Sequence, residues 1–265
     1  FLLTVALFSS SATLLRAQLV ADGATATING FATNIIGNLI VGNAASFTTL
    51  IVTNAGTVTN TGTGAIGETA PTQTNRVIVT GANSIWNNGS TLAIGRRGSF
   101  HELVVTNGGL VVNTFGNMAA TSGGTNRVVV TGAGSRWVCT ANANVGNSGS
   151  DNTLLITNGG RVDSAAGVVG NASMGNLALV TGEGSVWNCP SGLFVGQNVN
   201  SNQLIIADGA DVISGGAYVG GNFSQSGSGR SNSVVITGAG STWTRTSTSS
   251  VGNFGAFNQL TITNG

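Results

Sequence analysis

The chain has 265 residues, of which 41% are hydrophobic and only 6% are charged. All nine basic residues are Arg and the formal net charge is +1, so overall charge makes no electrostatic case for a nucleic-acid or anionic-surface partner. The 42 glycines follow no three-residue period, which excludes collagen. The rest is rich in Thr, Asn, Ser, Val and Ile, which predicts strands and turns in an extracellular scaffold more than in a cytosolic enzyme.

Residues 1–17, FLLTVALFSSSATLLRA, are typical of a secretory signal without its initiator Met and basic start, with cleavage expected after Ala17. The stretch is too short and too interrupted for a transmembrane helix; the alternative is a hydrophobic N-terminal cap. We expect residues 18–47 to form an irregular cap coil, because a terminal unit has only one neighbour. Since the sequence lacks an initial Met and stops inside a ThrAsnGly motif, we expect it to be a fragment of a longer protein.

Four copies of a 21-residue motif organise the remaining chain. They start at Asn75, Asn126, Asn176 and Asn232, and the second copy reads NRVVVTGAGSRWVCTANANVG. In every copy the Trp follows six residues after the Thr, and the closing Gly follows fifteen residues after it. Shared spacing over such a length predicts a repeat architecture.

A second motif without Trp alternates with the first, as in TLLITNGGRV from Thr153. Asn stands five residues before the Thr position in seven of nine half-repeats, and Thr48 and His101 take its place in the other two. The half with Trp runs 26 residues from Asn126 to Asn152, and the half without Trp runs 24. Such lengths match one turn of a β-solenoid, whereas a propeller blade needs roughly 40–45 residues.

Each half-repeat predicts three strands separated by corners where Gly and Asn allow positive φ. We therefore predict an all-β, parallel β-solenoid over residues 48–265, with about ten coils of 24–26 residues and three strands per coil, stacked into a rod of about 45 Å. Residues one and three places before each Thr, such as Val77 and Val79, should point inward. The recurring Asn should form a ladder at one corner, and the four Trp should pack in the core rather than bind sugars.

Insertions follow the coils without Trp, so loop variation is confined to one edge of the predicted rod. The longest loop spans residues 222–231, and the next spans residues 68–74. If the protein recognises a ligand, we expect that edge to do so. Cys139 and Cys189 occupy equivalent positions 50 residues apart; with one coil between them they lie about 9.6 Å apart, too far for a disulfide, and we predict two free thiols.

The alternation of VTGAGSxW with LxITNGGxV and ValGly resembles repeat-rich passenger regions of bacterial autotransporter-like surface proteins, over about residues 43–265. The resemblance implies a right-handed, single-stranded parallel β-helix that is exported. It also implies secretion or display at the cell surface of a Gram-negative-type bacterium, at the outer membrane, and a structural or adhesin role. It assigns no binding residues.

The candidates for chemistry are few. Glu183 and Asp208 should share one corner of neighbouring coils and form the best carboxylate pair, although we favour exposed turn positions for both; glycoside hydrolysis needs two carboxylates about 5–10 Å apart. His101 should replace Asn in the ladder, and Arg96 with Arg97 should form a solvated corner or a carbohydrate-contacting edge. We expect no catalytic, cofactor or metal site and no enzymatic activity.

The leading hypothesis is therefore a secreted or surface-displayed rod with a structural or adhesive role. Its expected partners are surface glycans, matrix components or other cells, and end-to-end or lateral self-association is a further expectation; no nucleic acid or membrane span is expected. The first alternative is a polysaccharide-binding or polysaccharide-degrading β-helix. The second is an ice- or crystal-surface binder, suggested by the threonines of TVTNTGTG at 57, 59, 61 and 63, which would need flat Thr ranks in several coils.

Overall fold

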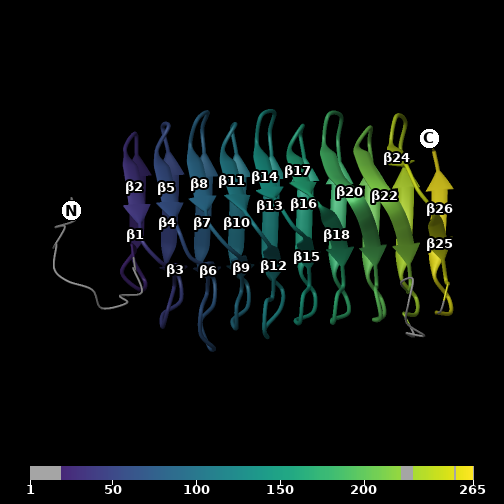
Figure 1. The fold of residues 1–265 in the computed structure, drawn as a ribbon, viewed down its shortest axis with the longest axis horizontal. Coiled ribbons are helices and arrows are strands. Elements are labelled where there is room, and N and C mark those ends of the chain that lie inside the picture. Colours follow the sequence, from purple (N-terminus) through teal and green to yellow (C-terminus); the bar gives the residue numbers. More distant parts are fainter. Residues whose placement is uncertain (1–18, 222–228, 254, 265) are drawn as a thin grey trace.

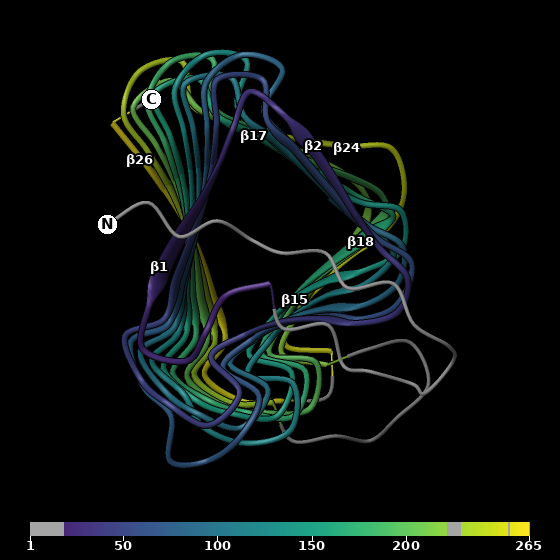
Figure 2. The same cartoon turned by 90° about the vertical axis from the view of Figure 1, so that its left-hand side faces the viewer.

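A computed structural model describes residues 19–221, 229–253 and 255–264. The described chain is all-β and winds through about nine turns of a parallel β-solenoid. Figure 1 shows the coils side by side from β1 to β26, and Figure 2 looks along the rod from its N-terminal end. In that view the chain turns clockwise as it recedes, so the helix is right-handed. The predicted fold class is confirmed, with nine full coils followed by the first strand of a tenth.

The first strand of every coil joins one ten-stranded parallel sheet. Its members, in spatial order, are β1 (Thr25–Asn29), β4 (Thr49–Thr53), β7 (Arg76–Thr80), β10 (Glu102–Thr106), β13 (Arg127–Thr131), β16 (Thr153–Thr157), β19 (Leu177–Thr181), β21 (Gln203–Ala207), β23 (Ser233–Thr237) and β26 (Gln259–Thr263). Every Thr position aligns with its equivalent in the next coil, as Thr106 does with Thr131. We call this the first-strand sheet.

The second and third strands of the coils share a 16-stranded sheet. The second strands are β2 (Ala32–Ile35), β5 (Thr57–Asn60), β8 (Ile85–Asn88), β11 (Leu110–Asn113), β14 (Arg136–Cys139), β17 (Arg161–Ser164) and β24 (Thr242–Arg245). The third strands are β3 (Leu39–Val41), β6 (Gly64–Ile66), β9 (Leu92–Ile94), β12 (Gly116–Met118), β15 (Ala143–Val145), β18 (Ala166–Val169) and β25 (Ser249–Val251). In two coils both strands run together as β20 (Val186–Val195) and β22 (Asp211–Val219), which joins the two sets into one sheet.

The core lies inside the coils and follows the period-two alternation of the strands. Val77 and Val79 are fully buried, as the spacing predicts, and so are Val128 and Val130 in a later coil. The intervening rank of the first-strand sheet points outward, yet it is also aliphatic, as Ile78 shows. Burial of the inward ranks supplies the main driving force for stacking the coils.

One corner carries a continuous ladder of side-chain acceptors, as predicted. In each coil the backbone N–H of the ladder residue donates to the side chain of its counterpart in the next coil, over 2.8 to 3.1 Å. The rungs are Thr48, Asn75, His101, Asn126, Asn152, Asn176, Asn202, Asn232 and Asn258. The ladder also explains the closing Gly: a Cβ on Gly95 would lie 2.4 Å from the side chain of Asn126. Bulk is excluded there because the amide of a later coil fills the space.

Three of the four Trp side chains are buried core residues, and Trp243 is partly buried against the core. Their contacts explain why Trp occurs in every second coil. Trp137 is buried, and its indole N–H donates to Asn113 Oδ1 of the preceding coil over 2.7 Å. The equivalent bonds run from Trp86 to Asn60, from Trp187 to Ser164 and from Trp243 to Ser214. The preceding coil also provides Gly116, where a Cβ would lie only 2.3 Å from the Trp137 ring. One coil therefore supplies the ring and its neighbour supplies the space and the acceptor.

Several expectations concern the ends and loops. The predicted signal, residues 1–17, lies outside the described residues, as does most of the loop at 222–231. The expected cap coil, residues 18–47, contains β1 to β3, which pair in register with β4 to β6; its role as a cap stays a prediction. Cys139 and Cys189 are free and buried, with Ser164 of one coil between them in the stack. Burial raises the pKa of both thiols to about 12.

Among the residues that the structure describes, no helix has the length and apolar character needed to cross a membrane.

Candidate functional site

A candidate site lies at the corner where the first strands begin, immediately outside the ladder. The residue before each rung adopts a left-handed backbone, with φ of 61° at Phe47, 56° at Thr74, 61° at Phe100 and 55° at Thr125. Their N–H groups are bonded to the neighbouring coil, as Phe47 N is to Gln73 O over 3.1 Å. The same backbone recurs in coils that carry other residues there, such as Asp151. The conformation is therefore a property of the corner, and only the side chains differ.

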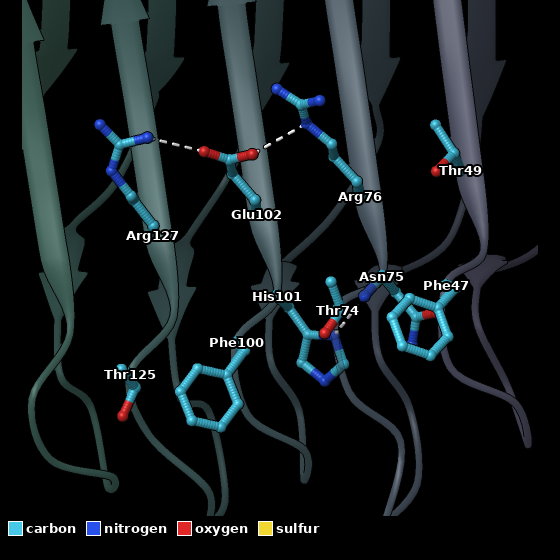
Figure 3. Close-up of a pocket in the computed structure, with 10 residues that line it drawn as sticks. All are labelled: Phe47, Thr49, Thr74, Asn75, Arg76, Phe100, His101, Glu102, Thr125 and Arg127. Atoms are coloured by element: carbon cyan, nitrogen blue, oxygen red, sulfur yellow. Dashed lines mark hydrogen bonds and ion pairs between the residues drawn. The ribbon is translucent and has the colours of Figure 1, made fainter.

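These side chains border a shallow pocket with a volume of about 400 Å³. Figure 3 shows Phe47, Thr74, Phe100 and Thr125 in a row across four successive coils. Phe47 is 69% exposed and Phe100 is 53% exposed. The lining residues are Phe47, Thr49, Thr74, Asn75, Arg76, Phe100, His101, Glu102, Thr125 and Arg127. We call this feature the corner pocket.

A charged row borders the corner pocket along the starts of β7, β10 and β13. Glu102 lies between two arginines, with Arg76 Nε 2.8 Å from Oε2 and Arg127 Nη1 2.7 Å from Oε1 (Figure 3). The three residues are register partners in adjacent parallel strands, which places opposite charges side by side. The guanidinium side chains remain 45% and 47% exposed. The row thus carries a net charge of +1 and keeps unused N–H donors facing solvent.

His101 and Asn75 line the pocket from the ladder itself. His101 Nδ1 accepts the N–H of Asn75 over 3.1 Å, so Nδ1 carries no proton and the ring is neutral. Burial lowers the pKa of His101 to about 4, opposed in part by the backbone of Thr72. Asn75 Nδ2 has no partner at hydrogen-bonding geometry among the described residues. His101 therefore acts as a ladder rung, as the sequence predicted, but it receives no bond from the Asn75 amide of the kind that Asn126 Nδ2 donates to Asn152.

The predicted carboxylate pair, Glu183 and Asp208, lies outside the corner pocket, and its two side chains do not contact each other. Glu183 and Asp208 do occupy one corner in neighbouring coils, and both are exposed. Asp208 Oδ2 accepts a hydrogen bond from Thr181 over 3.0 Å, and no contact joins the two carboxylates among the interactions of the described residues. Within the same part of the chain, no group of three or more His, Cys, Asp or Glu side chains could hold a metal ion.

Ion pairs engage several of the other charged side chains. Arg96 contacts the buried Glu68 over 3.1 Å, and Arg97 is exposed beside it. A second triad lies on the other sheet, where Asp163 accepts from Arg136 over 2.6 Å and from Arg161 over 2.7 Å. Burial raises the pKa of Asp163, but hydrogen bonds from Arg161, Arg136 and Asn188 outweigh burial and hold it below its usual range.

Threonines do form a rank, but not where the sequence suggested. Thr57 stacks on Ala32 and Ile85, and Thr59 stacks on Asn34 and Asn87, so no Thr rank passes through β5. The rank lies at the ends of the first strands, as Thr53, Thr80, Thr106, Thr131, Thr157, Thr181, Thr237 and Thr263, with Ala207 interrupting it. Figure 2 shows the first-strand sheet fanned about its middle, so the face is twisted and not flat.

The corner pocket lies on the edge that the insertions marked in the sequence, since Thr74 ends the loop at 68–74, but the row of Phe, Thr and Arg side chains was not predicted. The available signal was the recurrence of Phe directly before the rung, at Phe47, Phe100 and Phe257, but Thr48 and His101 looked only like exceptions in the Asn ladder. Stacking of the four coils that begin with β4, β7, β10 and β13 brings the Phe, Thr and Arg side chains together, because register alignment makes neighbours of residues about 25 positions apart.

Searches against protein-family models, curated proteins and solved structures find no match to this chain.

Proposed function

We propose that the chain is a secreted or cell-surface rod with a structural and adhesive role. The observation that carries this proposal is the ladder: eight consecutive backbone N–H groups bond to a side chain of the next coil, from Thr48 to Asn258. Such continuity favours a stiff element that holds its surface features at fixed spacing of about 4.8 Å per coil. A stiff array suits multivalent contact, in which several weak sites act together.

The composition supports action outside the cell. Charged residues make up 6% of the chain, and its exterior relies on Thr, Ser and Asn. The resemblance of the paired repeats to autotransporter-like passengers points in the same direction. The proposal therefore places the rod at the surface of a Gram-negative-type bacterium, with surface glycans, matrix or other cells as partners.

The competing functions receive less support from the geometry. For polysaccharide degradation, Glu183 and Asp208 are exposed and no contact joins them among the described residues. Glu102 and Asp163 engage arginine rather than another carboxylate. For ice or crystal binding, the Thr rank follows a twisted sheet, whereas a crystal plane requires a flat one. Glycan binding without cleavage is compatible with the rod.

The test uses cells that produce the natural full-length protein. We expect an antibody against the solenoid to label intact cells, and we expect added protease to remove that label. Deletion of the gene should reduce attachment of cells to glycan-coated surfaces or to one another. Labelling only after cell lysis, together with unchanged attachment, would overturn the proposal.

A further inference from the structure

Two phenylalanines of the corner pocket have no explanation in the stability of the coil. Phe47 and Phe100 are exposed, and both occupy left-handed backbone, which costs a non-glycine residue about 1–2 kcal/mol. Gly175 shows that Gly serves the same corner position. Neither exposure of an aromatic ring nor left-handed backbone favours Phe here, so a role in recognition accounts for the rings better than packing does.

The rings are arranged along the rod axis. Phe47 and Phe100 belong to coils two apart, so about 9.6 Å separates their positions, with Thr74 between them. Backbone bonds to the next coil hold each corner residue, as Phe100 N does to Gly124 O over 3.3 Å. Rings at fixed spacing fit a long chain molecule better than a small enclosed one, because the residues that line the pocket lie in a row across four successive coils (Figure 3).

The charge beside the rings selects the sign of the ligand. Arg76, Glu102 and Arg127 carry a net charge of +1, and each arginine spends one donor group on Glu102. His101 adds no charge because it is neutral at pH 7. The remaining guanidinium donors are suited to a carboxylate or sulfate. The formal net charge of the whole chain is also +1, so the total alone does not reveal this local cluster of arginines.

We propose that the corner pocket binds an acidic glycan whose chain lies along the rod axis. Phe47 and Phe100 stack against sugar rings, whose C–H faces suit an aromatic surface. Arg76 and Arg127 engage the acidic substituents, and Thr74 and Thr125 meet sugar hydroxyls between them. The acidic-glycan site rests on the proposed adhesive role and adds to it the class of ligand.

The molecule contains matched features that lack part of this combination. Phe257 occupies the same corner position with φ of 60° and is 78% exposed, but it lies outside the pocket. The triad of Arg136, Asp163 and Arg161 has the same charge, while its register neighbours are Leu110 and Val186 rather than aromatic residues. These two features provide the control variants.

The experiment is isothermal titration calorimetry of the purified full chain with an oligogalacturonate. We expect measurable binding that weakens with added salt. Replacing both rings in the variant Phe47→Gly with Phe100→Gly should weaken binding by about tenfold or more. Arg76→Gln with Arg127→Gln should weaken it by a similar factor. Because Gly suits left-handed backbone, thermal unfolding should show that the ring variants remain folded.

Controls separate the parts of the inference. Phe257→Gly and Arg136→Gln should leave affinity unchanged, and methyl-esterified oligogalacturonate should bind at least several-fold more weakly. Absence of binding by the natural chain, or equal affinity in the pocket variants, would overturn the proposal. Equal binding of the ester would contradict the proposal that the ligand is acidic. Equal binding of a polyglutamate peptide would contradict a glycan ligand and favour a protein ligand. Since cell-surface display is scored on intact cells, failure here and failure of the proposed adhesive role are distinguishable.

Discussion

At the scale of single residues, His101 shows how one departure from a repeat can make the stability of the fold depend on pH. The ladder requires an acceptor at this position, and neutral imidazole provides Nδ1 where the other rungs provide an amide oxygen. Protonation would convert that acceptor into a donor facing the N–H of Asn75. The fold therefore favours the neutral ring, in agreement with a pKa lowered to about 4 by burial.

We predict that acid destabilises the chain through this rung. Folding lowers the pKa of His101 from 6.5 to about 4, so the unfolded chain takes up the proton first as the pH falls. The stabilising contribution is present above pH 6.5 and is lost between pH 6.5 and about 4, by up to roughly 3 kcal/mol. Urea denaturation at pH 7 and at pH 4.5 should reveal the difference.

The matched variant is His101→Asn, which restores the amide of the other rungs. Its free energy of unfolding at pH 7 should stay within about 1 kcal/mol of the natural chain, and its decline between pH 7 and pH 4.5 should be much smaller. His101→Ala should be less stable at pH 7, because it leaves the N–H of Asn75 without an acceptor. An identical decline in the natural chain and in His101→Asn would rule out His101 as its source.

Corner residues also allow a prediction about strain. Phe100 adopts φ of 61° with its ring exposed, so Phe100→Gly should raise the free energy of unfolding by about 1 kcal/mol. Chemical denaturation of the single variant measures this change. A loss of more than about 1 kcal/mol would show that the ring packs on the corner and would weaken the assignment of Phe100 to recognition.

At the scale of the element, the functional unit of the fold is a pair of coils. Two side chains of the Trp coil form hydrogen bonds with the preceding coil: Trp137 donates to Asn113, and Ser135 Oγ accepts the N–H of Gly108 over 3.0 Å. The coil without Trp also bonds to the coil before it, because Asn107 Nδ2 donates to Thr80 Oγ1 over 3.1 Å. Each kind of coil is therefore complementary to the other, which fixes their alternation.

We predict strong coupling between Gly116 and Trp137 across one such pair. Gly116→Ala places a Cβ 2.3 Å from the Trp137 ring and should destabilise the chain by about 1–3 kcal/mol. The penalty should shrink by at least half in a Trp137→Val background, because Val stands at the equivalent place in the neighbouring coils, as Val111 and Val162. A double-mutant cycle in urea measures the coupling. Additive effects would mean that the ring does not restrict this glycine.

At the scale of the whole molecule, stability is spread along a one-dimensional stack. Each coil contacts its neighbours, so a defect should be felt locally. Asn152 lies near the middle of the ladder, where Oδ1 accepts the N–H of Asn126 and Nδ2 donates to Asn176 Oδ1, each over 3.0 Å. A break at this rung removes bonds on both sides of one coil.

We predict that Asn152→Ala lowers stability by at least about 2 kcal/mol, because buried groups lose their partners. Hydrogen exchange should show the largest loss of protection in β13, β16 and β19, with β1 and β4 little changed. Asn171→Ala is the control: its amide donates to Asn147 at the surface edge and should cost less than about 0.5 kcal/mol. Uniform loss of protection over the whole rod would contradict the local behaviour expected of stacked coils.

The sequence alone determined the solenoid, because its information is periodic. Spacing of Asn, Thr, Trp and Gly defined the coil length, the inward ranks such as Val128 and Val130, the ladder with His101 as a rung, and the burial of Trp. Each of these depends on neighbours within one coil or on the same position in the next coil. A repeat displays both relations in the printed order of residues.

The tertiary structure decided which outward side chains meet. The contact of Arg76 and Arg127 with Glu102 depends on strand register and side-chain direction across several coils. So does the row that places Phe47 and Phe100 on either side of Thr74. The sequence showed the Thr residues of TVTNTGTG together, but the Thr rank actually runs across coils at the ends of the first strands. Periodicity predicts the inside of a solenoid because the core repeats; its surface site arises where the repeats differ, and only stacking shows which differences are neighbours.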